Sequence, residues 1–139
     1  MSGNGKVVTL LFCLTLCQCS SDYYASQTRT LNAICEAGSR YVTGITDAHS
    51  KDEIIFSINN FTKQISRLHK KFLRLYDWYS KKNPEGKGFG SPGPEYLEAV
   101  KKLAEIDKKI DEAGRKVAGY AADPEVQEAL IRLAGVMDF

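Results

Sequence analysis

Apolar residues in the middle of the chain recur at alternating steps of four and three. The row is Ile54, Ile58, Phe61, Ile65, Leu68, Phe72, Leu75 and Tyr79. This spacing places every member on one face of an α-helix. Ser50 followed by Glu53 is typical of a helix start, because each side chain can satisfy a free backbone N–H. Asn83-Pro84 ends the pattern, since proline disfavours helix at the residue before it. The pattern therefore predicts one long amphipathic helix between Ser50 and Asn83.

Three other segments show the same spacing, at about residues 23–45, 94–121 and 124–137. Their rows are Tyr24, Thr28, Leu31, Cys35, Gly38, Val42 and Ile45; Tyr96, Val100, Leu103, Ile106, Ile110, Ala113, Val117 and Tyr120; and Val126, Leu130, Leu133 and Met137. The small residues Cys35 and Gly38 would let another helix approach closely. The last segment is short, and we expect it to pack as a lid. Together the four segments predict an all-α fold, an antiparallel bundle of about four helices.

The connections between these segments differ in length. Residues 46–49 form a short turn, which suits an antiparallel pair. Residues 82–93 contain four glycines and two prolines, and a loop of this length is often functional or disordered. We therefore predict one domain at 20–139, with a Gly/Pro-rich loop between its second and third helices.

The N-terminus has the composition of an export signal. Lys6 precedes an apolar run of eleven residues, 7–17, and Gln18-Cys19-Ser20-Ser21 follows it. A short basic region, a short apolar region and small residues are typical of a cleaved secretory signal. A bilayer-spanning helix needs about twenty apolar residues. The pattern thus predicts that residues 1–19 direct export and are removed.

Cys19-Ser20-Ser21 after this run resembles the start of a mature bacterial lipoprotein. The resemblance implies a cysteine that is acylated at the cleavage point and tethers the protein to a membrane. Leu16 lies three residues before Cys19, and Leu14 three before Cys17. Both cysteines remain candidates. The resemblance implies an outer-membrane, periplasmic or cell-surface location; ordinary signal cleavage, with free secretion, is the alternative, and retention of the segment a third.

The charge is unevenly distributed along the chain. The formal net charge of +2 gives no general attraction to nucleic acid. Residues 51–82, however, hold eight Lys or Arg against three acids, whereas residues 95–139 hold seven against ten. Neighbouring helices with complementary fields would explain this difference.

A mostly basic stripe lies on the face opposite the apolar row. It consists of Lys63, Arg67, Lys70, Arg74, Asp77 and Lys81. It is either a solvated face or a docking surface for anionic lipid, lipopolysaccharide or an acidic protein. Trp78, with Tyr76 and Tyr79, either closes the core or forms an exposed binding cluster. Our candidate binding residues are Lys63, Arg67, Lys70, Arg74 and Trp78, together with the loop 83–93.

No motif indicates catalysis. His49 and His69 lie twenty residues apart on different elements, and a metal site needs several converging ligands. The glycine-rich stretch 86–90 lacks the preceding strand and the Lys-Ser/Thr ending of a phosphate loop. Cys35 fits as a small core residue. We therefore expect a protein that is not an enzyme, with no cofactor, no metal and no nucleic-acid partner.

The sequence favours an exported, membrane-tethered helical protein that acts by contact with an envelope protein, as an interaction or assembly factor. One alternative is a carrier of a lipid or small hydrophobic ligand. Its pocket would be lined by Phe61, Phe72, Tyr76, Trp78, Tyr96 and Tyr120. Another is a freely secreted helical effector. The sequence leaves the oligomeric state open.

Overall fold

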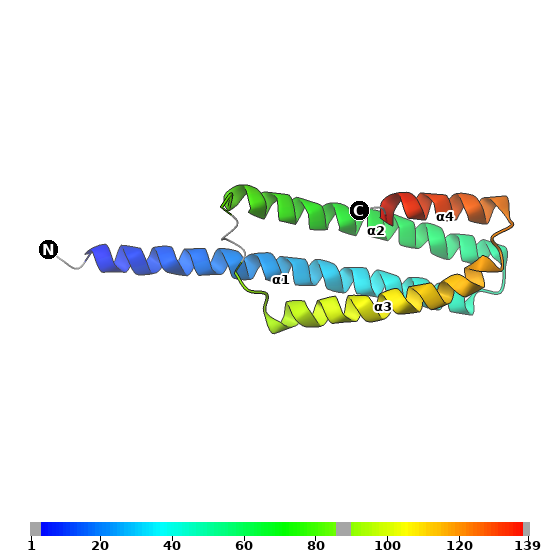
Figure 1. Cartoon of the computed structure of the whole chain (residues 1–139), viewed down its shortest axis with the longest axis horizontal. Helices are drawn as coiled ribbons and strands as arrows, with labels where there is room; N and C mark the ends of the chain where they lie inside the picture. The colour runs from blue at the N-terminus through cyan, green and yellow to red at the C-terminus, as the bar shows by residue number, and fades with distance from the viewer. Residues whose placement is uncertain (1–3, 86–89, 138–139) are drawn as a thin grey trace.

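A computed structural model describes residues 4–85 and 90–137, and the side chains within 23–85 and 90–137. Four helices alternate in direction: α1 Asn4–Asp47, α2 Lys51–Lys82, α3 Pro94–Ala118 and α4 Pro124–Met137 (Figure 1). No strand occurs in the described part of the chain. The prediction of an all-α antiparallel bundle is therefore confirmed.

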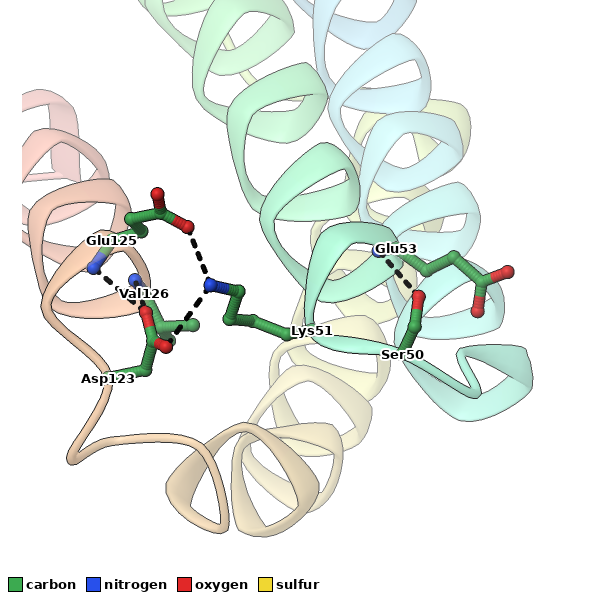
Figure 2. A network of polar contacts seen from close by, with 6 residues as sticks. All are labelled: Ser50, Lys51, Glu53, Asp123, Glu125 and Val126. Carbon is green, nitrogen blue, oxygen red and sulfur yellow. Dashed lines mark hydrogen bonds and ion pairs between the residues drawn. The ribbon is translucent and has the colours of Figure 1, made fainter.

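The ends of α2 lie where the sequence predicts them. The Ser50 hydroxyl accepts a hydrogen bond from the Glu53 N–H at 3.3 Å (Figure 2). The Glu53 carboxylate accepts from the His49 N–H, one residue earlier than a standard capping box requires. At the other end, the Asn83 side-chain amide donates to the Tyr79 carbonyl at 3.2 Å. These contacts satisfy backbone groups that the helix leaves unpaired.

Helix α1 lies between α2 and α3, and α4 packs on the far side of α2. The extensive contacts are α1 with α3, α1 with α2, and α2 with α4. The predicted apolar row of α1 faces α3. A Cβ added at Gly38 would lie 2.4 Å from Ile106 Cγ2, and Cys35 Sγ lies 4.0 Å from the Ala99 carbonyl oxygen. Small residues therefore do allow the close approach that the sequence predicts.

A second row on α1 faces α2, and the sequence analysis missed it. Its members, again at steps of four and three, are Tyr23, Gln27, Thr30, Ile34, Ala37, Tyr41, Gly44 and Ala48. The Tyr41 ring stacks on Phe61 with ring centroids 4.6 Å apart. A Cβ at Gly44 would lie 3.3 Å from Ser57 Cβ. Because α1 is covered on two sides, it carries two buried rows where an outer helix carries one.

All four helices meet around the turn between α1 and α2. Buried residues from each helix form one cluster there, namely Ile45, Ala48, Ile54, Ile58, Ala113, Val117, Val126 and Ala129. The nearby Lys116 ammonium donates to the carbonyl oxygens of Thr46 and Ala48, both at 2.6 Å. A cation at this position satisfies free carbonyls at the C-terminus of α1.

The predicted row of α3 is wrong at one position. Val100 is 42% exposed, whereas Ala99 is 1% exposed and lies against α1. Ala99 fits the four-three spacing between Tyr96 and Leu103, and its small side chain permits the contact with Cys35. Helix α3 also ends at Ala118, three residues earlier than predicted.

Helix α4 lies lengthwise along the first half of α2 and is not a lid across the end of the bundle (Figure 1). Lys51 Nζ lies 3.3 Å from the Asp123 carboxylate and 2.7 Å from that of Glu125 (Figure 2). Further along, Arg132 donates to the Asn59 side chain at 3.2 Å. Since α4 has 14 residues and α2 has 32, α4 leaves the second half of α2 uncovered.

Two predicted segments fall partly outside the described residues. The predicted Gly/Pro-rich loop would lie between Lys82 and Pro94, but residues 86–89 are not described, so this loop stays a prediction. Next to them, Gly90 has φ 64°, a left-handed conformation that favours glycine. The Tyr24 hydroxyl donates to its carbonyl at 3.4 Å. The first turns of α1 extend past the other helices in Figure 1. The side chains of Cys17 and Cys19 are not described, so export and lipidation remain predictions.

Candidate functional site

An open groove of about 900 Å³ lies between α1 and the second half of α2. Its lining from α1 is Ala25, Ser26 and Arg29, and its lining from α2 is Arg67, Lys71, Arg74, Leu75, Trp78 and Tyr79. Four of these nine side chains are cationic, and none is acidic. The groove is thus a basic site with aromatic and aliphatic groups beside it.

The antiparallel register of α1 and α2 builds this site. Tyr23 packs edge to face on Tyr79 with centroids 4.7 Å apart, and Tyr41 meets Phe61. Each step toward the C-terminus of α1 is therefore a step toward the N-terminus of α2. Arg29, which lies between these two contacts on α1, consequently faces the stretch of α2 that carries Arg67, Lys71 and Arg74.

A buried glutamine supports the same register beside the groove. Gln27 is fully buried, and its amide nitrogen lies 3.3 Å from both the Tyr23 hydroxyl and the Phe72 carbonyl oxygen. Its Oε1 has no hydrogen-bond partner among the described residues. The bond to Phe72 ties α1 to α2 through the backbone, so it holds the two helices in this alignment.

The structure brings together three of the five predicted binding residues. Arg67, Arg74 and Trp78 line the groove. Lys63 and Lys70 are exposed on α2 but are not part of its lining. Sequence reasoning missed Lys71 and Arg29. The signal for Arg29 was the second row of α1, because that row shows which side of α1 faces α2.

Within 23–85 and 90–137, no carboxylate neutralises the positive charge of the groove. No described acid lies within 4 Å of Arg29, Arg67, Lys71 or Arg74. Arg29 donates to the Ser26 hydroxyl at 3.1 Å, a neutral partner that does not cancel its charge. Four cations along one groove raise the local potential and favour an anionic ligand.

Trp78 forms one end of the groove and is 48% exposed. Its ring packs edge to face on Tyr79 with centroids 4.6 Å apart, and Lys82 Nζ lies 3.8 Å from its ring centroid. These contacts fix the indole on the surface without covering it. An ordered, half-exposed tryptophan beside cations is a common anchor in binding sites.

A second exposed area lies on the opposite side of α2. Leu73 is 49% exposed and Tyr76 is 53% exposed. In the four-three spacing of α2 they continue the row that includes Asn59, which contacts α4. They therefore lie on the face that α4 covers along the first half of α2 and leaves open along the second.

Four of the six aromatic residues proposed to line a carrier pocket lie in separate places in the described structure. Phe61 packs in the core against Tyr41, and Tyr96 packs edge to face on Tyr24 with centroids 5.0 Å apart, between α1 and α3. Trp78 and Tyr76 lie on the surface. This arrangement favours contact at the surface over enclosure of a ligand.

Three further features that would bear on function are a metal site, a membrane span and a reactive thiol among the described residues. They contain no group of three His, Cys, Asp or Glu that could hold a metal ion. None of the helices has, in its described part, the length and apolarity needed to cross a membrane. Cys35 is buried with a free thiol, and burial raises the pKa of that thiol, although nearby Lys102 lowers it. A raised thiol pKa reduces the thiolate fraction that nucleophilic chemistry needs.

Comparison of the chain with protein-family models, with curated proteins and with solved structures gave no match. The groove and the uncovered face of α2 are the two surface features of the described residues that suggest a function.

Proposed function

We propose that this is an exported, membrane-tethered, non-catalytic interaction protein that binds a helical segment of an envelope protein. The observation that carries the proposal is the uncovered second half of α2. Leu73 and Tyr76 are half exposed on the face where α4 packs earlier along the same helix. A partner helix that continues beyond the end of α4 would cover Leu73 and Tyr76, just as α4 covers the same face along the first half of α2.

The groove residues lie on the opposite side of α2 from this contact face. Trp78 and Arg74 are the predicted binding residues nearest to Leu73 and Tyr76 in sequence, and Lys70 lies three residues before Leu73. Export and tethering are supported by the apolar run 7–17 and by the resemblance of Cys17 and Cys19 to lipoprotein acylation sites. The carrier hypothesis has weaker support, because its aromatic residues are dispersed. A freely secreted effector would use the same contact face and would differ only in having an N-terminus without acylation.

A photo-cross-linking residue tests the contact face directly. We place it at position 73 in the full chain and irradiate cells that make the protein. The expected result is one discrete adduct that mass spectrometry identifies as an envelope protein. Tyr76→Asp in the same chain should abolish the adduct while circular dichroism remains unchanged, because a carboxylate would oppose apolar packing at the centre of the contact.

The matched control places the same cross-linker at position 131. Ile131 is 71% exposed and lies on α4 instead of α2. Adducts that are identical from positions 73 and 131, or an adduct from 73 that survives Tyr76→Asp, would contradict the proposal. Mass spectrometry of the mature N-terminus tests the tether separately, and an unmodified Ser20 amine would exclude acylation of Cys19 and Cys17.

A further inference from the structure

The groove between α1 and α2 has the features of a site that faces a membrane surface. It combines four cations with no paired carboxylate among the described residues, and it ends in an exposed indole. Tryptophan at the level of lipid headgroups, with Lys and Arg around it, is typical of protein segments that lie at a bilayer interface. Lys82 over the Trp78 ring adds a further cation at the same end.

The position of the groove in the bundle supports this interpretation independently. Tyr23 contacts Tyr79, so the end of the groove at Trp78 and Tyr79 lies beside the point where α1 extends past the other helices (Figure 1). The candidate acylation sites Cys17 and Cys19 precede Tyr23 on the same continuous helix. Cys17, the more distant of the two, is six positions from Tyr23, which is about 9 Å of helix at about 1.5 Å per residue. A chain held at a membrane through its N-terminus therefore holds the groove near lipid headgroups.

An acidic protein segment is the competing ligand for a basic groove. Two observations favour lipid. The lining combines cations with Leu75, Tyr79 and a half-exposed Trp78, a mixture that suits the boundary between headgroups and acyl chains. The groove also lies close to the candidate acylation sites Cys17 and Cys19, whereas the face with Leu73 and Tyr76 points to another side of α2. The two faces can therefore be occupied at the same time.

We propose that the groove formed by Arg29, Arg67, Lys71, Arg74 and Trp78 binds the phosphate headgroups of anionic phospholipids and lays this side of the bundle on the membrane. The phosphates would interact with the arginines, which can bind them through two parallel N–H groups. The Trp78 ring would enter the interface. The inference shares the tether with the proposed function but does not depend on the partner bound at Leu73.

Trp78 makes the test direct, because it is the single tryptophan of the chain. The full chain is mixed with vesicles of phosphatidylcholine alone or with about one third phosphatidylglycerol. Binding is measured by co-sedimentation and by the emission of Trp78. We expect stronger binding to the anionic vesicles, with emission shifted to shorter wavelength. The N-terminal run contributes equally to both lipids, so the difference between them reports the charged surface.

Two pairs of substitutions locate the effect. Arg67→Gln with Arg74→Gln should reduce partition onto the anionic vesicles about 25-fold, or about fivefold per cation removed, and leave binding to phosphatidylcholine unchanged. The control, Lys101→Gln with Lys108→Gln, removes the same charge from exposed positions on α3 and should cost less than about fivefold. If the double groove variant loses helicity, Arg29→Gln from the other helix should give the single-cation effect.

Several outcomes would overturn the inference. Equal losses in the groove and control pairs would mean that net charge alone attracts the protein. A groove variant that keeps the anionic preference would show that lipid binds elsewhere. A Trp78 shift with polyglutamate but not with anionic vesicles would make the groove a protein site. The Leu73 cross-link does not involve these vesicles, so failure of either proposal can be recognised without the other.

Discussion

At the scale of single residues, small side chains set the distances between the helices of this bundle. A Cβ added at Gly38 would be too close to Ile106, and a Cβ added at Gly44 would be too close to Ser57. Ala99, and not the larger Val100, lies at the point where Cys35 approaches α3. The sequence shows such positions only as weak members of an apolar row. Their role becomes visible when the neighbouring helix is known.

Replacing Gly38 with alanine should destabilise the protein. The new Cβ would lie 2.4 Å from Ile106 Cγ2 and 3.3 Å from Ile110 Cδ1, so the Ile106 side chain or one of the two helices must shift. Overpacking of this kind costs about 1–3 kcal/mol, which urea denaturation would measure. Gly114→Ala is the matched control, because it adds a Cβ with nothing within 4 Å and should stabilise α3 by about 0.5–1 kcal/mol. A Gly38→Ala protein as stable as the wild type would show that α1 and α3 are further apart.

At the scale of helices, the sequence predicts best where a row consists of large apolar residues. The row of α2 from Ile54 to Leu68 is buried as predicted, and its end at Asn83 is confirmed. The second row of α1 could not be found in the same way. Gln27 and Thr30 are fully buried polar residues, and Gly44 is a small one, so a search for apolar periodicity passes over them. The groove could not be predicted either, because Arg29 is seen to lie beside α2 only when this second row is recognised.

The short α4 depends on electrostatic contacts at its first turn. The Asp123 carboxylate accepts hydrogen bonds from the N–H groups of Glu125 and Val126 at 2.9 and 3.3 Å, and it pairs with Lys51 (Figure 2). Partial burial opposes ionisation of Asp123, but these bonds outweigh it and hold the pKa of Asp123 below its ordinary value of 3.8. Hydrogen bonds to the carboxylates of Glu125 and Asp123 raise the pKa of Lys51.

The stability that Asp123 supplies should therefore disappear in acid. A carboxyl with a lowered folded-state pKa contributes fully above its ordinary value, and the contribution is lost as pH falls through the folded-state pKa. Asp123→Asn keeps a capping side chain but removes the charge. The variant should be less stable than the wild type at neutral pH, and the difference should shrink below pH 3.8. Thermal melts over this range measure it, and a difference that does not change with pH would contradict the ion pair.

At the scale of the whole molecule, the order α3, α1, α2, α4 explains why one half of α2 is core and the other half surface. The first half lies between α1 and α4, whereas the second half has α1 on one side only. Exposed apolar residues follow from this arrangement at Leu73 and Tyr76. The number of helices and their alternating directions could be predicted from the sequence. The order of contacts could not, because it depends on which rows face each other.

The contrast between two leucines of α2 tests this arrangement. Leu68 is 7% exposed and Leu73 is 49% exposed. Leu68→Asp should unfold the bundle, because it places an unpaired charge in the core, at a cost of several kcal/mol. Leu73→Asp should change the free energy of unfolding by less than about 1 kcal/mol, as is usual for surface positions. Circular dichroism with urea titration would distinguish them, and similar losses in both variants would place Leu73 in the core.

The register of α1 against α2 underlies the groove and the uncovered face alike, and an engineered disulfide measures it most directly. A Cβ at position 44 would lie 3.3 Å from Ser57 Cβ, close to the spacing that a disulfide requires. In a background without the native cysteines, Gly44→Cys with Ser57→Cys should form an intramolecular disulfide under mild oxidation. Gly44→Cys with Asn59→Cys should not, because Asn59 lies on the side of α2 that contacts α4. A disulfide between positions 44 and 59, and none between 44 and 57, would contradict the account.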